Sequence, residues 1–160
     1  VDVEDWFQVL NMADHIDRAS WDSHALRCGD STRRLLDLFA KRGARATFFF
    51  LGWIAERLPD LVRDVRSAGH EIGSHGYDHQ CLHDLAGAEG FDRDLARTEA
   101  ILAGITGERP VSFRACPQGQ AALPTRPGRP PPLRATGRPL SPRRRCAARS
   151  RSPRPSSPRR

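Results

Sequence analysis

The composition of this chain changes abruptly near Ala115, and this change decides which part of the chain can build a folded core. Residues 1–115 hold 14 of the 26 basic residues, all 19 acidic residues and all eleven aromatic residues, which gives a net charge of −5. Residues 116–160 hold 12 arginines, 11 of the 13 prolines, and no acidic or aromatic residue. The overall net charge of +7 therefore comes from residues 116–160 and says nothing about the folded part.

Residues 116–160 are predicted to form a disordered Arg/Pro-rich tail. Their few apolar side chains and many prolines cannot bury enough surface to offset the entropy of ordering the chain. The segment also lacks Lys, Asn, Ile, Phe, Tyr and Met, which are encoded by A/T-rich codons. Such a composition is typical of GC-rich DNA that is translated out of frame. We therefore interpret residues 1–115 as the N-terminal part of one domain and residues 116–160 as out-of-frame translation.

Strand-like and helix-like segments alternate along residues 1–115. Asp30 or Ser31 suits the N-cap of the first helix, and Gly43 suits its C-terminal end. The alternation predicts an α/β domain with a parallel sheet or barrel, whose core is expected to include Trp6, Trp21 and Trp53. The expected strands are 1–4, 46–51, 70–73 and 111–114, and the expected helices are 31–42, 59–68 and 89–103.

The cysteine spacing and hydropathy exclude several classes of protein. The four cysteines show no CxxC spacing, so neither a disulfide framework nor a zinc knuckle is predicted. No apolar run approaches eighteen residues, so no membrane segment is expected. Neither the compartment nor the oligomeric state follows from these features.

Two histidines and a group of acids are the residues best suited to chemistry. His75 and His79 lie four residues apart in a glycine-rich segment, and Asp2, Glu4 and Asp5 crowd the end of the first strand. One carboxylate and two histidines form a three-ligand set for a divalent metal, with one coordination position left open for water. The alternatives are an incidental histidine pair and a solvated acidic strand end.

Arg114 lies at the end of the last expected strand and could hold a carboxylate by a bidentate pair. The alternative is an ordinary surface arginine. If the pair forms, one acid could bind metal while its neighbour stays free as a general base.

Together, these motifs resemble the NodB-type polysaccharide deacetylases, carbohydrate esterase family 4. The resemblance is to the branch found with bacterial exopolysaccharide and exosortase systems, which is similar to allantoinase-like peptidoglycan deacetylases. It covers residues 1–115 in the family's order and spacing. The matching text is Val1-Asp-Val-Glu-Asp-Trp-Phe-Gln8, Trp21-Asp-Ser23, Ser31-Thr-Arg-Arg-Leu-Leu36, Ala46-Thr-Phe-Phe49, Leu51-Gly-Trp53, Gly69-His-Glu-Ile-Gly-Ser-His-Gly-Tyr77 with His79, and Phe113-Arg-Ala115.

The resemblance implies a distorted (β/α) barrel, of which this chain would form a part, and zinc or another divalent metal as cofactor. It implies a bacterial enzyme of the cytoplasm, periplasm or cell envelope that removes N-acetyl groups from a polysaccharide or oligosaccharide. By analogy, Asp5, His75 and His79 are assigned to the metal, Asp2 to the general base and Arg114 to its orientation. Glu4 is an alternative for either acidic role.

The resemblance ends after Ala115, where the family's later strands and late histidine motif do not follow. We therefore expect a truncated or frameshifted chain with impaired activity. Because part of the barrel would be absent, we also expect the apolar run Phe48–Phe50 to lack part of the structure that would bury it. The alternatives are a cyclic-amide hydrolase, and a non-functional fragment whose basic tail binds polyanions unspecifically. No specific nucleic-acid partner is expected.

Overall fold

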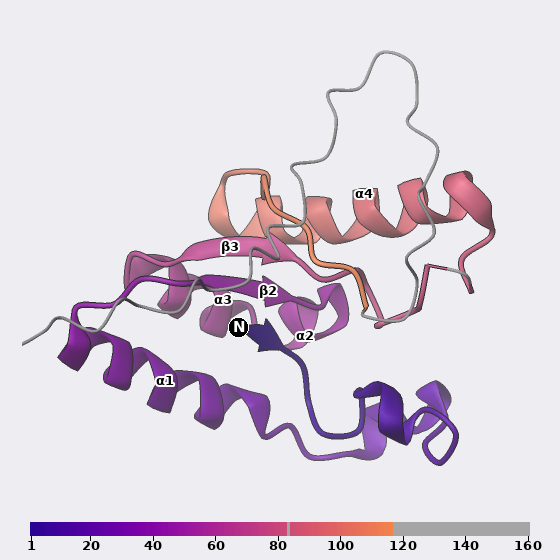
Figure 1. The fold of residues 1–160 in the computed structure, drawn as a ribbon, viewed down its shortest axis with the longest axis horizontal. Helices are drawn as coiled ribbons and strands as arrows, with labels where there is room; N and C mark the ends of the chain where they lie inside the picture. The colour runs from indigo at the N-terminus through magenta and orange to yellow at the C-terminus, as the bar shows by residue number, and fades with distance from the viewer. Residues whose placement is uncertain (83, 117–160) are drawn as a thin grey trace, which may run out of the picture.

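The computed structural model describes residues 1–82 and 84–116, which form a three-stranded parallel sheet covered by helices (Figure 1). The predicted α/β class is confirmed. A parallel bridge between Ser74 and Phe113 lies beside the third strand, so the strand expected at 111–114 is reduced to this bridge. The strands lie in the spatial order β1 (Asp2–Val3), β2 (Thr47–Phe50) and β3 (Glu71–Ser74).

Within the described residues, four α-helices and two short 3-10 helices lie between the strands or follow the last one. Three α-helices match the predicted ones within a few residues, but the short helix after β2 was missed because its apolar residues continue the run of β2. The helices are η1 (Leu10–Met12), η2 (Arg18–Ser23), α1 (Cys28–Arg42), α2 (Gly52–Arg57), α3 (Pro59–Ser67) and α4 (Gly87–Thr106). The last α-helix, α4, packs against α2, α3 and β3.

The two faces of the sheet have different roles. Val3, Phe48, Phe50 and Ile72 are buried in the main core, under the helices. The expectation that the run Phe48–Phe50 lacks full cover is therefore wrong for Phe48 and Phe50, because helices of this chain cover that face, whereas Phe49 is only partly buried. Side chains alternate along a strand, so Asp2 and Phe49, which are paired in register, share the opposite face.

The three tryptophans do not share one environment. Trp21 and Trp53 are buried, as the sequence predicted, and their rings pack edge to face. Trp6 is 41% exposed, so its assignment to the core is wrong. Its ring lies beyond the end of β1, where His24 and the Arg27 guanidinium border it.

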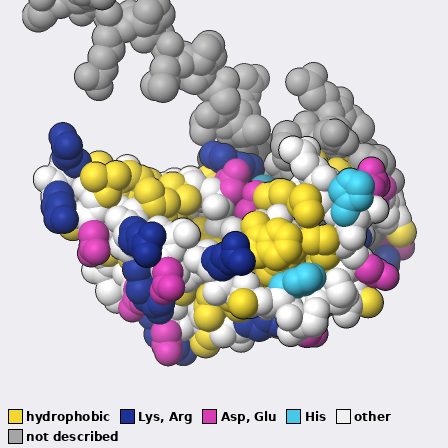
Figure 2. Space-filling view, turned by 90° about the horizontal axis from the view of Figure 1, so that it is seen from below, with side chains coloured by type: hydrophobic (Ala, Val, Ile, Leu, Met, Phe, Trp, Pro, Cys, Tyr) yellow, Lys and Arg dark blue, Asp and Glu magenta, His cyan; other side chains and the backbone are white. Residues whose placement is uncertain are grey.

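The surface on the side of α1 mixes charges of both signs. Figure 2 shows Lys and Arg side chains interspersed with Asp and Glu on this face, beside patches of hydrophobic side chains. No helix within the described residues is long and apolar enough to cross a membrane. The predicted tail lies outside the described residues from position 117 onward, so its disorder stays a prediction. Cys116, the last described residue, is buried, with its Sγ 3.0 Å from Cys81 Sγ.

Two glycines give a matched test of helix geometry. Gly43 ends α1 in the left-handed region, at φ 59°, whereas Gly104 lies inside α4, and a Cβ would meet nothing within 4 Å at either position. We expect Gly43→Ala to lower the free energy of unfolding by about 1 kcal/mol and Gly104→Ala to raise it by about 0.5 kcal/mol. Urea denaturation measures both, and a stabilising Gly43→Ala would contradict the left-handed cap.

Candidate metal centre

Residues that are far apart in the sequence meet at one edge of the sheet. Glu4 directly follows β1, His75 directly follows β3, and Arg114 follows the bridge at Phe113. The carboxyl ends of parallel strands lie at the same edge, which is where α/β proteins place their ligands. The sequence expectation of a site at this edge therefore has a structural basis.

Glu4, His75 and His79 form a cluster of potential metal ligands. One ligand atom from each lies within 4.8 Å of the others. His79 Nε2 is 3.3 Å from Glu4 Oε2, and both histidines are buried. Glu4 Oε2 is itself buried and has no hydrogen-bond donor among the described residues. A buried carboxylate oxygen without a donor is unfavourable, and a cation would satisfy it, so this donor set fits a divalent metal.

Backbone carbonyls orient both imidazole rings. His75 Nδ1 lies 2.8 Å from the carbonyl oxygen of Arg114, and His79 Nδ1 lies 2.8 Å from that of Gln8. A carbonyl only accepts hydrogen bonds, so each Nδ1 carries a proton, and in the neutral ring Nε2 is then the nitrogen whose lone pair can bind a metal. Second hydrogen bonds of this kind are usual for metal-binding histidines. The sequence analysis gave Gln8 no role, because a backbone acceptor leaves no signature in residue type.

Burial shifts the pKa values of two of the three candidate ligands toward their neutral forms. Burial raises the pKa of Glu4, against the opposing effect of nearby His79. Burial also lowers the pKa of His75, and the hydrogen bond to Arg114 opposes this shift. A neutral imidazole is the form that binds metal, so His75 is ready for a ligand role. Glu4 is the group whose charge a metal would stabilise.

Asp2 and Arg114 form an ion pair beside this cluster. Arg114 Nη1 lies 3.0 Å from Asp2 Oδ1 and 3.3 Å from Asp2 Oδ2, and the guanidinium lies over the ring of Phe49. The structure thus brings together the two residues that the sequence analysis assigned to the general base and its orientation. In this pair one guanidinium nitrogen contacts both carboxylate oxygens. The roles of both residues stay predictions.

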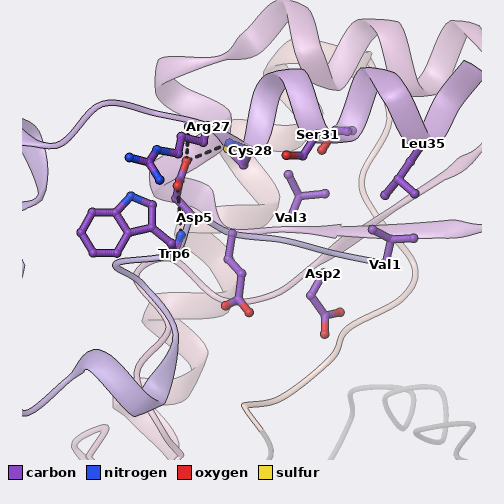
Figure 3. Close-up of a pocket in the computed structure, with 11 residues that line it drawn as sticks. Val1, Asp2, Val3, Asp5, Trp6, Arg27, Cys28, Ser31 and Leu35 are labelled. Atoms are coloured by element: carbon purple, nitrogen blue, oxygen red, sulfur yellow. Dashed lines mark hydrogen bonds between the residues drawn. The ribbon is translucent and has the colours of Figure 1, made fainter.

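Asp5, which the sequence analysis assigned to the metal, lies outside the ligand cluster. Its Oδ2 accepts hydrogen bonds from the backbone N–H groups of Arg27 and Cys28, at 2.6 and 2.9 Å. Its Oδ1 accepts one from Trp6 N–H. Figure 3 shows the Asp5 side chain pointing toward the start of α1, whereas Asp2 points away from that helix. Asp5 therefore caps α1, and Glu4 takes the place beside the histidines.

The alternation of strand side chains could have indicated this arrangement. Residues 2 and 4 fall on one face and residue 5 on the other, provided that the strand geometry continues past Val3. A carboxylate at a helix N-terminus is also favourable, because unpaired N–H groups point outward there. The sequence did not reveal that Asp5 would meet the start of α1, which lies more than twenty residues further along the chain.

The fold and this site define an α/β protein with a candidate divalent-metal centre at the carboxyl edge of a parallel sheet. Residues 19–126 match the polysaccharide deacetylase family, so the chain belongs to that family. The matched range includes His75, His79 and Arg114 but starts after Asp2, Glu4 and Asp5. A divalent metal is the cofactor that this family uses, and the Glu4 cluster could hold one.

Individual relatives agree with this assignment. The chain is 35% identical over 83 residues to a peptidoglycan-N-acetylglucosamine deacetylase of Bacillus cereus, covering 52% of this chain and 30% of the relative. It is 38% identical over 91 residues to a chitin deacetylase of Arthroderma benhamiae, covering 54% and 24%. A family 4 carbohydrate esterase from Streptomyces lividans, solved with acetate, matches at 36% identity and a TM-score of 0.51, covering 54% and 44%. The chain thus spans less than half the length of each.

Proposed function

We propose that this chain is part of a metal-dependent deacetylase that removes N-acetyl groups from amino sugars of a bacterial exopolysaccharide. The observation that carries the proposal is the grouping of Glu4, His75 and His79 beside the Asp2–Arg114 pair. Three of these residues can hold a cation, and the second carboxylate, that of Asp2, is paired with Arg114 and lies outside the ligand set.

Each residue has a distinct part in this proposal. Glu4, His75 and His79 would hold the metal, which supplies Lewis acidity and an activated nucleophile at neutral pH. Asp2 would accept a proton as general base. Arg114 would fix the orientation of Asp2 through their ion pair, and the Phe49 ring supports the guanidinium.

We further propose that this chain alone turns over slowly. It spans less than half the length of the relatives it matches, and the late histidine motif that the family resemblance implies as general acid does not follow Ala115. Without a general acid, amide cleavage loses a contribution of about 10²–10⁴-fold in rate.

The test combines metal binding with acetate release. We expect the purified chain to bind one zinc ion and, once loaded, to release acetate slowly from N-acetylated chitooligosaccharides. Asp2→Asn is expected to abolish that release and leave zinc bound, because Asp2 is not among the candidate ligands. Absence of zinc binding would refute the metal-dependent activity, and rapid turnover would refute the impairment.

A further inference from the structure

The segment that carries both histidines has a backbone conformation that it does not adopt easily by itself. Gly76 has φ 79°, and His79 has φ 60° and is the one non-glycine residue with positive φ in the described chain. Residues with a side chain are disfavoured at positive φ, and they keep this conformation only where the surrounding structure holds them. The segment 75–79, which we call the histidine loop, therefore depends on contacts made by other elements.

Two of these contacts come from the start of α2. The backbone N–H of Gly52 donates to the carbonyl oxygen of Gly76, and that of Trp53 donates to the carbonyl oxygen of Tyr77, each at 2.9 Å. Both bonds satisfy carbonyl groups of the histidine loop. The Tyr77 N–H, between the two histidines, needs an acceptor from elsewhere.

Asp94 on α4 supplies that acceptor. Its Oδ1 and Oδ2 lie 3.1 and 3.2 Å from Tyr77 N, so the carboxylate accepts this N–H with both oxygens. The approach is close, because a Cβ on Gly76 would lie 3.0 Å from Asp94 Oδ2. In Figure 1, α4 runs along the β3 side of the sheet, where it can reach the loop that follows this strand.

The Tyr77 side chain is held separately from its backbone. Its hydroxyl donates to Glu56 Oε2 at 2.7 Å, and the Arg97 guanidinium lies 3.2 Å from the ring centroid. Burial raises the pKa of Asp94, and the Tyr77 N–H opposes that shift by stabilising the carboxylate. The hydrogen bond from Tyr77 N–H thus partly offsets the unfavourable burial of a charged group.

We propose that Asp94 is a positioning residue that holds the histidine loop in the conformation that directs His75 and His79 toward one metal. The inference rests on the proposed metal site. Among the described residues, no hydrogen bond or ion pair joins Asp94 to either histidine ring. Asp94 would therefore act through the backbone N–H of Tyr77. Its removal would loosen the loop and let the two imidazoles move apart.

The experiment compares two substitutions of similar size. Asp94→Asn keeps an oxygen that can accept the Tyr77 N–H, whereas Asp94→Leu has no acceptor. We expect Asp94→Leu to bind zinc about 10-fold more weakly, as for other groups that orient metal ligands, and to change the visible spectrum of the cobalt-loaded protein. Asp94→Asn should restore both properties. Glu89→Gln, which removes an exposed charge from the same helix, should leave both unchanged.

A second measurement needs no metal. In the metal-free protein, hydrogen exchange of residues 75–79 should be about 10-fold faster in Asp94→Leu than in the wild-type chain. Unchanged exchange, or weaker zinc binding with an unaltered cobalt spectrum, would overturn the positioning role. If the wild-type chain bound no zinc, the proposed function would fail, and the exchange comparison would still decide whether Asp94 holds the loop. Asp94→Ala, which also has no side-chain acceptor, takes the place of Asp94→Leu if the latter does not fold.

Discussion

Glu4→Gln is expected to weaken zinc binding by more than about 100-fold, because it removes the only acid of the ligand cluster in the described residues. Substituting groups that merely orient metal ligands costs about 10–100-fold, and loss of a ligand's charge should exceed that. The amide keeps the shape of the side chain, so the fold should persist. Competition with a chromogenic chelator measures the affinity.

The matched control for this substitution is Glu89→Gln, which makes the same chemical change at an exposed position on α4. Its zinc affinity should equal that of the wild-type chain. Wild-type affinity in Glu4→Gln would show that the metal, if it binds at all, is held without Glu4. The structural assignment of the acidic ligand would then be wrong.

Asp5→Ala is expected to lower the free energy of unfolding by about 3 kcal/mol and to leave zinc affinity nearly unchanged. The substitution removes the acceptor of three backbone N–H groups at a site that is 3% exposed. Loss of an N-terminal cap costs about 1 kcal/mol, and a buried hydrogen bond to a charged group contributes about 1.5–3 kcal/mol. Urea denaturation of the metal-free protein measures the change.

Asp17→Ala provides the comparison, because Asp17 accepts a single hydrogen bond from Ala19 N–H at an exposed 3-10 helix start. It should cost about 0.5 kcal/mol, within the lower range for exposed caps. If Asp5→Ala instead kept wild-type stability and lost zinc, the sequence-based assignment of Asp5 to the metal would stand. The two variants thus separate a capping role from a ligand role.

The sequence predicted the local elements of this chain well. Pro59 and Gly43 lie at a helix start and a helix end, and the apolar run at 46–51 contains β2. The N-cap of α1 was not predicted correctly, because the expected caps, Asp30 and Ser31, lie inside the helix. The acceptor at its start is Asp5, a residue from another element, and local propensity has no information about such a partner.

The candidate site shows the same division between local and distant information. The spacing of His75 and His79, and the acids near β1, were sufficient to predict a metal site with two histidines and one carboxylate. Choosing among Asp2, Glu4 and Asp5 required the three-dimensional arrangement. Each carboxylate has a different partner: Arg114 for Asp2, the histidine cluster for Glu4, and the start of α1 for Asp5.

By itself, the sequence determined the α/β class, the boundary of the acidic and aromatic-rich part, and the residue types of a metal site. These properties follow from composition and from periodicity along the chain, which are local. Only the tertiary structure decided which acid meets the histidines, that Phe48 and Phe50 are covered, and that Asp94 reaches the histidine loop. Those outcomes depend on where distant segments pack, and even neighbouring residues such as Glu4 and Asp5 can have quite different partners.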